Sequence, residues 1–197
     1  MPTLLGGTCV TLNNAPLPLL ATSAGQINAQ LPPTLAAGRY PLVVRSITSG
    51  AASGTSTITV AKVAPAIFMD SQGAVILHAD GNRVDKNHPA SRDEPLTIYA
   101  TGLGVTTGGK VTAGNPAPSN PLAITGTVQV FFGNPTISDA GWIVDWSGLA
   151  PGLIGTYIIK CRVPGTHLKG NGLPVILKIG GVSSVSTGPS APLAWVN

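Results

Sequence analysis

Charged residues are scarce in this chain. Of its 197 residues, 11 are Lys or Arg and 7 are Asp or Glu, which leaves a formal net charge of +4. The basic residues are dispersed and aromatic residues make up only 5%, whereas a nucleic-acid surface needs clustered Lys and Arg with stacking rings. No nucleic-acid partner is therefore expected. The hydrophobic content of 43% nevertheless excludes a disordered chain.

Long hydrophobic runs and a leader sequence are also missing. No segment reaches the roughly 20 apolar residues of a membrane-spanning helix, so no membrane span is expected. The N-terminus shows no basic stretch followed by an apolar one, so this sequence contains no signal peptide. That absence fits a natural N-terminus that lies further upstream.

Glycine and proline are plentiful, with 25 and 18 copies, and they separate short runs in which apolar and polar residues alternate. Such alternation predicts β-strands, and no stretch of a dozen residues carries the 3.6-residue stripe of a helix. Many short strands at regular spacing indicate an all-β sandwich or barrel. The expected strands cover residues 8–12, 40–47, 55–60, 74–78, 96–100, 128–132, 141–146, 156–163 and 173–179.

The chain also repeats itself, which bears directly on its architecture. An apolar-Pro pair recurs, followed by a second such pair with three apolar residues and a basic one, and then by a turn of small residues. We expect two tandem β-sandwich units, in residues 1–63 and 64–197, with the boundary in residues 61–65. The matching segments are 7–16 with 126–135, 31–33 with 163–165, 40–45 with 173–178 and 49–53 with 180–184.

The first copy lacks the front part of the second. Residues 66–100 supply strands ahead of the second repeated block, whereas only Met1 to Leu5 precede the first. A sandwich without its early strands has an unpaired edge and an open core, so something is expected to complete it. The candidates are residues 66–78 or the tail 190–197 of the same chain, a strand donated by a neighbouring molecule, and upstream sequence. Completion within the chain or by a neighbour is favoured.

Several segments resemble known protein families. The run Leu96 to Gly104 looks like the first core strand and glycine-rich turn of IPT/TIG-type immunoglobulin-like (Ig-like) domains. Together, five segments resemble the uncharacterised C-terminal domain of Solibacter-type acidobacterial secreted proteins, over nearly the whole chain. The resemblance implies two tandem Ig-like sandwiches, the first lacking its N-terminal strands, at the end of a large exported protein, and it implies no reaction. These segments are residues 23–32, 64–68, 100–104, 148–152 and 180–184.

The chain departs from that family at three positions. Ala29 stands where Phe or Val usually follows Gln-Ile-Asn, and Cys9 and Cys161 stand where β-branched or small residues are commoner. The two cysteines fall at unrelated positions of separate units, so no disulfide between them is expected. Alternation places Cys161 on one face with Ile159 and Val163, which predicts a buried apolar residue rather than a reactive thiol. Cys9 is expected to be more exposed.

Signatures of metal binding are weak. Residues 80–87 carry side-chain oxygens, but two basic residues intrude and the spacing of a calcium loop is missing, so a polar hairpin turn is favoured over a metal site. The weak metal candidates there are Asp80, Asn82 and Asp85. The histidines are far apart and lack paired spacing. They are His78, His88 and His167.

Signatures of catalysis are missing as well. Glycoside hydrolysis needs two carboxylates that face each other across a cleft, and nothing in the sequence places Asp93 with Glu94, or Asp139 with Asp145, in that way. No Gly-x-Ser-x-Gly segment is present. We therefore expect no enzymatic activity, no catalytic residues and no cofactor.

Two tryptophans are the candidate ligand-binding residues. Trp142 and Trp146 have even spacing on one expected strand, so both would project from one face together with Val144. On a solvent-exposed face the rings could stack on a sugar, whereas on the inner face they would be part of the core. The core interpretation is favoured, because a buried tryptophan is common in sandwiches.

These observations predict a structural or adhesive module that spaces, anchors or links parts of a secreted or cell-surface bacterial protein. The expected partners are proteins, either further copies of the chain that associate by strand complementation or upstream domains of the parent protein. The alternative from another class is a carbohydrate-binding module appended to an exported enzyme. Exposure of Trp142 and Trp146 would distinguish the two.

Overall fold

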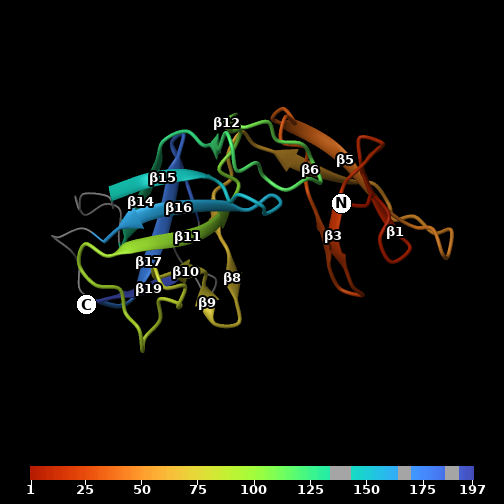
Figure 1. Ribbon diagram of the computed structural model, residues 1–197. Helices are drawn as coiled ribbons and strands as arrows, with labels where there is room; N and C mark the ends of the chain where they lie inside the picture. Colours follow the sequence, from red (N-terminus) through yellow and green to blue (C-terminus); the bar gives the residue numbers. More distant parts are fainter. Residues whose placement is uncertain (134–142, 164–169, 185–190) are drawn as a thin grey trace.

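The chain consists of strands and turns wherever its structure is described. The computed structural model describes residues 1–133, 143–163, 170–184 and 191–197, and within these ranges it contains several antiparallel sheets and no helix (Figure 1). The described residues accordingly include no long apolar helix that could cross a membrane. The prediction of an all-β, sandwich-type fold is confirmed.

The N-terminal lobe, residues 1–60, has two small sheets. One is antiparallel with the strand order β2-β1-β5-β6, and the other is the hairpin of β3 and β4. Val10 and Leu12 of β1 share a buried cluster with Leu17 and Leu19, which lie before and at the start of β3. The strands are β1 (Thr8–Leu12), β2 (Ala15–Pro16), β3 (Leu19–Thr22), β4 (Ile27–Ala29), β5 (Gly38–Ser46) and β6 (Ser56–Val60).

The C-terminal lobe, residues 63–197, has two larger sheets and the hairpin of β8 with β9. The first sheet has the order β10-β11-β16-β15-β13-β12, with β7 also paired to β11, and the second places β17 between β14 and β18, with β19 also paired to β17. The strands are β7 (Ala66–Ile67), β8 (Met69–Asp70), β9 (Gly73–Ala74), β10 (Ile76–Leu77), β11 (Pro95–Thr101), β12 (Thr107–Gly108), β13 (Ala123–Ile124), β14 (Val128–Phe132), β15 (Ile143–Leu149), β16 (Tyr157–Arg162), β17 (Gly170–Ile179), β18 (Val182–Ser183) and β19 (Leu193–Val196).

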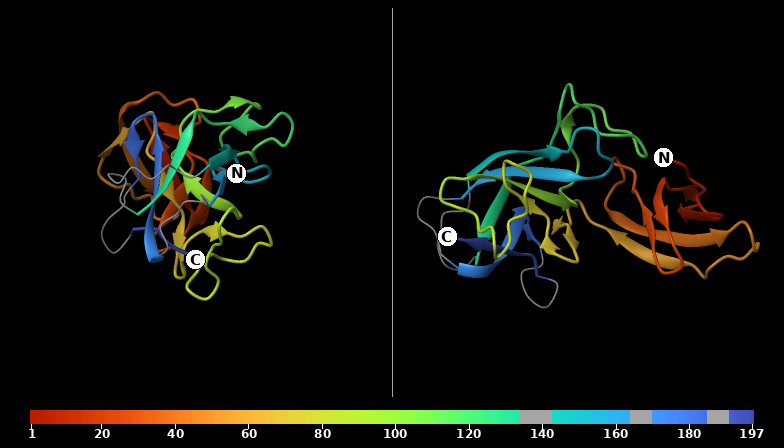
Figure 2. Two further views of the ribbon diagram at one scale, coloured as in Figure 1. Left: turned by 90° about the vertical axis from the view of Figure 1, so that its left-hand side faces the viewer. Right: turned by 60° about the horizontal axis from the view of Figure 1, so that its bottom comes forward.

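The two sheets of the C-terminal lobe face each other (Figures 1 and 2), and the core residues lie between them. Every second residue of β11 points inward, and Leu96, Ile98 and Ala100 are at most 2% exposed. They share one cluster with Val130 and Leu177 from the facing sheet. Full burial of such an aliphatic side chain contributes about 1.5–3 kcal/mol, so this contact between layers stabilises the lobe.

The two lobes use the same strand pairs. β1 pairs with β5 in the first lobe as β14 pairs with β17 in the second. We call β5 and β17 the central strands, and they contain the prolines of the repeat, Pro41 and Pro174. The carbonyl of Pro41 accepts a hydrogen bond from the N–H of Asn13 at 2.8 Å, and that of Pro174 accepts one from Gly133 at 2.8 Å. Both donors have a positive φ, 48° and 81°. The repeat in sequence thus corresponds to a repeat in hydrogen bonding.

A serine after each central strand makes the same two bonds. The N–H of Ser53 donates to the carbonyl of Val44 at 2.8 Å, and its hydroxyl oxygen accepts from the N–H of Val44 at 3.1 Å. Ser184 bonds to Leu177 in the same way, at 2.8 and 3.0 Å. The sequence repeat aligns these two serines. In each case the hydroxyl oxygen accepts a backbone N–H of the central strand that would otherwise bond to the carbonyl of a neighbouring strand.

Both lobes also share a β-bulge. β3 carries one extra residue, Leu20, in its ladder with β4, and β15 carries Asp145 at the corresponding point of its ladder with β16. The correspondence is fixed by the partners Ala29 and Cys161, which the repeat aligns and which precede the register shift in each hairpin. A bulge of this kind reverses the alternation of side chains along its strand.

In β1 and β14, the positions that correspond in the structure are shifted by one residue from those that the sequence repeat aligns. Matching residues 7–16 with 126–135 makes Leu12 the counterpart of Phe131. In the structure its counterpart is Phe132, because Leu12 and Phe132 each lie opposite the residue that follows the central proline. Both side chains are buried, as inward-facing positions require.

The segments expected to complete the first copy lie elsewhere. β7 and β10, within residues 66–78, pair with β11, and β19, in the tail, pairs with β17. The prediction that they complete the N-terminal lobe is wrong, because their backbone groups are already bonded in the C-terminal lobe. The division into residues 1–63 and 64–197 remains a prediction, as does completion by other segments.

The segment that connects the two lobes is hydrogen-bonded to Gly102, just after β11. The N–H of Ala64 donates to the carbonyl of Gly102 at 2.8 Å. Gly102 has a φ of +73°, and a Cβ built on it would lie 1.9 Å from the carbonyl oxygen of Ala64. Any side chain at this position therefore collides with backbone atoms.

We expect Gly102→Ala to lower the free energy of unfolding by several kcal/mol, on the order of 3, because backbone strain adds to the collision. Gly81→Ala is the matched control, since Gly81 also has a positive φ, +86°, but no atom lies within 4 Å of its Cβ position. Its loss should be about 1 kcal/mol. Urea denaturation followed by tryptophan fluorescence measures both, and equal losses would contradict the steric argument.

Candidate functional site

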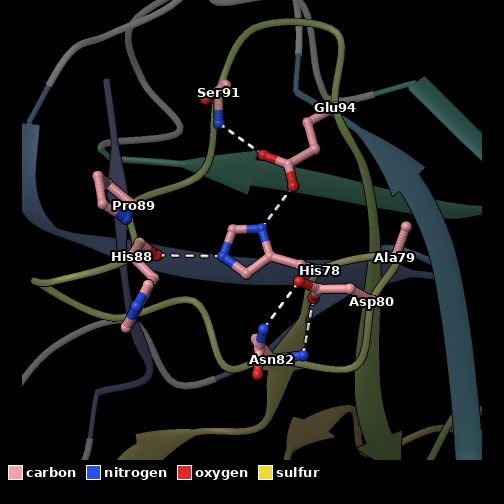
Figure 3. A pocket seen from close by; sticks show the side chains of 8 residues that line it. All are labelled: His78, Ala79, Asp80, Asn82, His88, Pro89, Ser91 and Glu94. Atoms are coloured by element: carbon pink, nitrogen blue, oxygen red, sulfur yellow. Dashed lines mark hydrogen bonds and ion pairs between the residues drawn. The ribbon is translucent and has the colours of Figure 1, made fainter.

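A polar hollow opens on the C-terminal lobe beside the start of β11. Its volume is about 460 Å³, and it lies between the turn after β10 and the loop that leads into β11 (Figure 3). Its lining contains imidazole, carboxylate and amide groups, which are the kinds of side chain that bind polar ligands or transfer protons. The lining residues are His78, Ala79, Asp80, Asn82, His88, Pro89, Ser91 and Glu94.

His78 is bonded through both of its ring nitrogens. Nδ1 lies 2.5 Å from Oε1 of Glu94, and Nε2 lies 3.1 Å from the backbone carbonyl oxygen of His88. The other carboxylate oxygen of Glu94 accepts the N–H of Ser91 at 2.8 Å. Because both partners of the imidazole are acceptors, the protonated ring donates to both at once.

Strand pairing brings His78 and Glu94 together. Leu77 of β10 pairs with Thr97 of β11, so the residue after one strand and a residue before the other meet at the same end of the ladder. The sequence predicted both strands but not that they are neighbours, and the histidines therefore looked isolated. The signal that could have indicated this pair is a histidine just after one expected strand and a glutamate just before another.

The surroundings of His78 favour its charged form. Partial burial opposes the charge, but the hydrogen bonds to Glu94 and to the carbonyl of His88, with the attraction of the Glu94 and Asp80 carboxylates, outweigh it. The pKa of His78 is therefore raised above its usual value of 6.5. In this arrangement neither ring nitrogen is free to take a proton from a substrate. The His78–Glu94 contact instead links the loop before β11 to the end of β10.

The weak metal candidates belong to two separate turns. Asp80 accepts the backbone N–H of Asn82 at 2.9 Å and its side-chain amide at 2.8 Å. Asp85 accepts the backbone N–H groups of Asn87 and His88 at 2.7 and 2.8 Å. These bonds lower the pKa of both carboxyl groups. Within the described ranges no group of three or more His, Cys, Asp or Glu side chains is placed to hold a metal ion.

Trp146 lies on the outer face of its sheet. The bulge at Asp145 interrupts the alternation, so Val144 pairs with Cys161 and packs on the core, whereas Trp146 pairs with Lys160 and faces away from it. The prediction that Val144 and Trp146 share one face is therefore wrong. Trp142, like the candidate residues His167 and Asp139, lies outside the described residues.

The indole of Trp146 is half-buried against its own strand. A Cβ at Gly148 would lie 2.7 Å from two ring atoms, so the absence of a side chain there makes room for the indole. The Nε1 atom is buried and has no hydrogen-bond partner among the described residues. The ring therefore presents apolar surface rather than its polar atom.

The same outer face carries further apolar side chains. Tyr99 of β11 pairs with Ile158 of β16, and Ile158 pairs with Gly148 beneath the indole. Ile124 of β13, 42% exposed, pairs with the same glycine. Together with Trp146, Lys160 and Arg162, this face combines aromatic and aliphatic surface with basic side chains.

The two cysteines are free and differ in exposure. Cys9 is half-buried, whereas Cys161 is completely buried in the core. Burial, together with the nearby charge of Asp145, raises the pKa of the Cys161 thiol to about 12. Cys161 is thus an apolar core residue without thiolate chemistry at neutral pH.

No protein-family model matches this chain, and no curated protein or solved structure matches it. Its fold and the geometry of its side chains are therefore the basis for a functional proposal.

The His78–Glu94 pair predicts how stability depends on pH. The pKa of His78 is raised on folding, so its contribution is present below about pH 6.5 and is lost as the pH rises through the folded-state value. We expect His78→Gln to lose more stability relative to the native chain at about pH 5.5 than at about pH 8.5.

Thermal unfolding of both proteins at the two pH values measures this difference. His88→Gln is the control, because His78 bonds only to the backbone of His88, and the ion pair of the 67% exposed His88 side chain with Asp85, at 3.5 Å, should contribute little. A loss for His78→Gln that does not change with pH would contradict the assigned contact.

The exposure of the two thiols predicts different reactivity. In the folded protein a maleimide should modify Cys9 at neutral pH and leave Cys161 unmodified, because the buried thiol is both inaccessible and protonated. Mass spectrometry should show one adduct in buffer and two in guanidinium chloride. Two adducts at comparable rates in buffer would show that the core of the C-terminal lobe opens readily.

Proposed function

We propose that this chain is a non-catalytic structural or adhesive module of a secreted or cell-surface bacterial protein. It is built from two Ig-like β-sandwich units of the IPT/TIG type, and it spaces or links its parent protein by adding strands at open sheet edges. Its partners are proteins, either neighbouring copies or other domains of the parent protein. It uses no metal, cofactor or catalytic residue.

The observation that carries this proposal is the use of the carboxylates inside the fold. In the described part of the chain, five of them are bonded to turns or to basic side chains, so they stabilise loops. Two of the five, Asp80 and Glu94, line the polar hollow, but His78 lies beside both, and they bond to Asn82 and to His78 with Ser91. A hydrolytic acid pair needs two carboxyl groups that converge on one bond. The five are Asp70, Asp80, Asp85, Glu94 and Asp145.

The recurrence of hydrogen bonds supports the tandem arrangement. The bonds at Pro41 and Pro174, and those at Ser53 and Ser184, recur at matching positions of β5 and β17. Such duplication is typical of extracellular sandwich modules that repeat along a chain. The location outside the cell rests on the resemblance to the acidobacterial domain and on the polar, charge-poor composition.

A carbohydrate-binding module is the second candidate. It is favoured by the outer face of the first C-terminal sheet, where Trp146, Tyr99 and Ile158 lie close to Lys160. Aromatic rings on a flat sheet face can stack on sugar rings. The structural role is preferred because the indole nitrogen of Trp146 is buried and the ring is only partly accessible.

Trp146→Ala separates the two functions. We expect the native chain and this variant to behave alike in affinity electrophoresis against soluble polysaccharides, and neither to hydrolyse chromogenic glycosides, esters or peptides. Lys178→Ala, an exposed change on the other sheet, is the control for general effects of substitution. Retardation of the native chain that disappears in Trp146→Ala would favour the carbohydrate-binding module, and turnover of any substrate would contradict both candidates.

A further inference from the structure

Five matched apolar positions are covered in the C-terminal lobe and uncovered in the N-terminal lobe. In the C-terminal lobe all of them are 0% exposed, whereas their counterparts are half-buried or exposed. The counterparts follow from the shared bulge and from the shared bonds of the central strands. The pairs are Ile27 with Ile159, Ala29 with Cys161, Leu31 with Val163, Leu42 with Val175, and Val44 with Leu177.

In the C-terminal lobe the cover is β11. It pairs with β16 so that Leu96 lies opposite Cys161 and Ile98 opposite Ile159. Its inward side chains belong to the same cluster as Leu177. In the N-terminal lobe β4 is the counterpart of β16, but its sheet contains only β3 and β4. No described strand takes the position of β11 there, and near this edge the described part of the C-terminal lobe contacts only the side chain of Gln30, next to the end of β4, through Gly114 and Gly155.

The free edge of β4 presents backbone groups for another strand. The N–H of Gln30 donates to the carbonyl of Pro18 on the β3 side, at 2.9 Å, so the peptide groups of its neighbours Ala29 and Leu31 point to the opposite side. The side chain of Ala29 faces the core side, because it pairs with the buried Leu19, and it is nevertheless exposed. An extended segment could therefore add to this edge and place its side chains over the apolar face.

The charge pattern defines the kind of segment that fits. Residues 1–38 contain no Lys, Arg, Asp or Glu, so the whole hairpin around β4 is uncharged. β11, Pro95–Thr101, is likewise uncharged and carries apolar residues at every second position. A charged donor strand would lose hydration without gaining an ionic partner.

A second copy of this chain is a poor donor. Its own β11 is held by β16, β10 and β7, and Leu96, Ile98 and Ala100 are buried. Donation would therefore require the C-terminal lobe to open and to lose most of its core contact. A partner whose matching strand is free avoids this cost.

We propose that the edge of β4 is an acceptor site for an extended strand of the β11 type from a different polypeptide segment. The donor is uncharged, has aliphatic side chains at alternate positions, and runs antiparallel to β4, with its first and second inward residues opposite Ala29 and Ile27. This inference deepens the proposed structural function and rests on it, since it specifies the partner strand and the edge that receives it.

A peptide of residues 92–104 tests the site, because it contains β11 and its own charged N-terminal residues keep it soluble. Fluorescence anisotropy of the labelled peptide should show saturable binding to the native chain, and the peptide should raise the melting temperature. A control peptide with Leu96→Asp and Ile98→Asp should not bind, because it places two charges over the apolar face.

Two variants of neighbouring exposed residues on β4 locate the site. Ala29→Asp should weaken peptide binding by at least about tenfold, because its side chain faces the core side under the added strand. Asn28→Asp is the matched control, since it introduces the same charge on the opposite face and should leave binding unchanged. Circular dichroism confirms that both variants are folded.

A cross-link tests the register in a chain with Cys9→Ser. Ala29→Cys should form a disulfide with a peptide carrying Leu96→Cys and not with one carrying Thr97→Cys, since Leu96 is the residue opposite the counterpart of Ala29.

Failure of the native peptide to bind, equal weakening by the two β4 variants, or cross-linking without register preference would each overturn the proposal. So would a concentration-dependent dimer that Ala29→Asp abolishes, because the occupant would then be a second copy. None of these results bears on catalysis or sugar binding, which decide the proposed function separately.

Discussion

The pairing of β11 with β16 is the interaction on which the C-terminal lobe depends. β11 also carries β7 and β10, and its inward side chains fill the space between the two sheets. A sheet needs a partner for its edge strands and a cover for its apolar face, and β11 meets both needs. The N-terminal lobe has the same central strands and the same hairpin. It differs because no described strand takes that place, which leaves a small cluster of four buried residues surrounded by partly buried ones.

The longer strands could be predicted from the sequence because alternation over five or more residues has a clear period. β5, β11, β14 and β17 appear at the expected places. Strands of two residues, such as β7, β12 and β18, have no period to detect and exist because a longer neighbour supplies their hydrogen bonds. Partner choice was also hidden from the sequence, so the roles expected for residues 66–78 and for the tail were wrong.

The candidate site was less predictable than the fold. His78 and Glu94 meet only because β10 lies beside β11, and Trp146 faces outward only because one extra residue precedes it. Both facts depend on register, which alternation does not determine. The turn around Asp80 was anticipated, because Asp, Gly and Asn favour such turns through contacts within a few residues.

The shared bulge has a consequence for how such hairpins diverge. The extra residue is Leu20 in one lobe and Asp145 in the other, an exposed leucine and an exposed aspartate that have no chemistry in common. The bulge is therefore encoded by the number of residues between fixed ladder partners and not by side-chain identity. A substitution at the bulge keeps the register of the hairpin. Deletion of this one residue, in contrast, would move the side chains on one side of the bulge to the opposite face of the sheet.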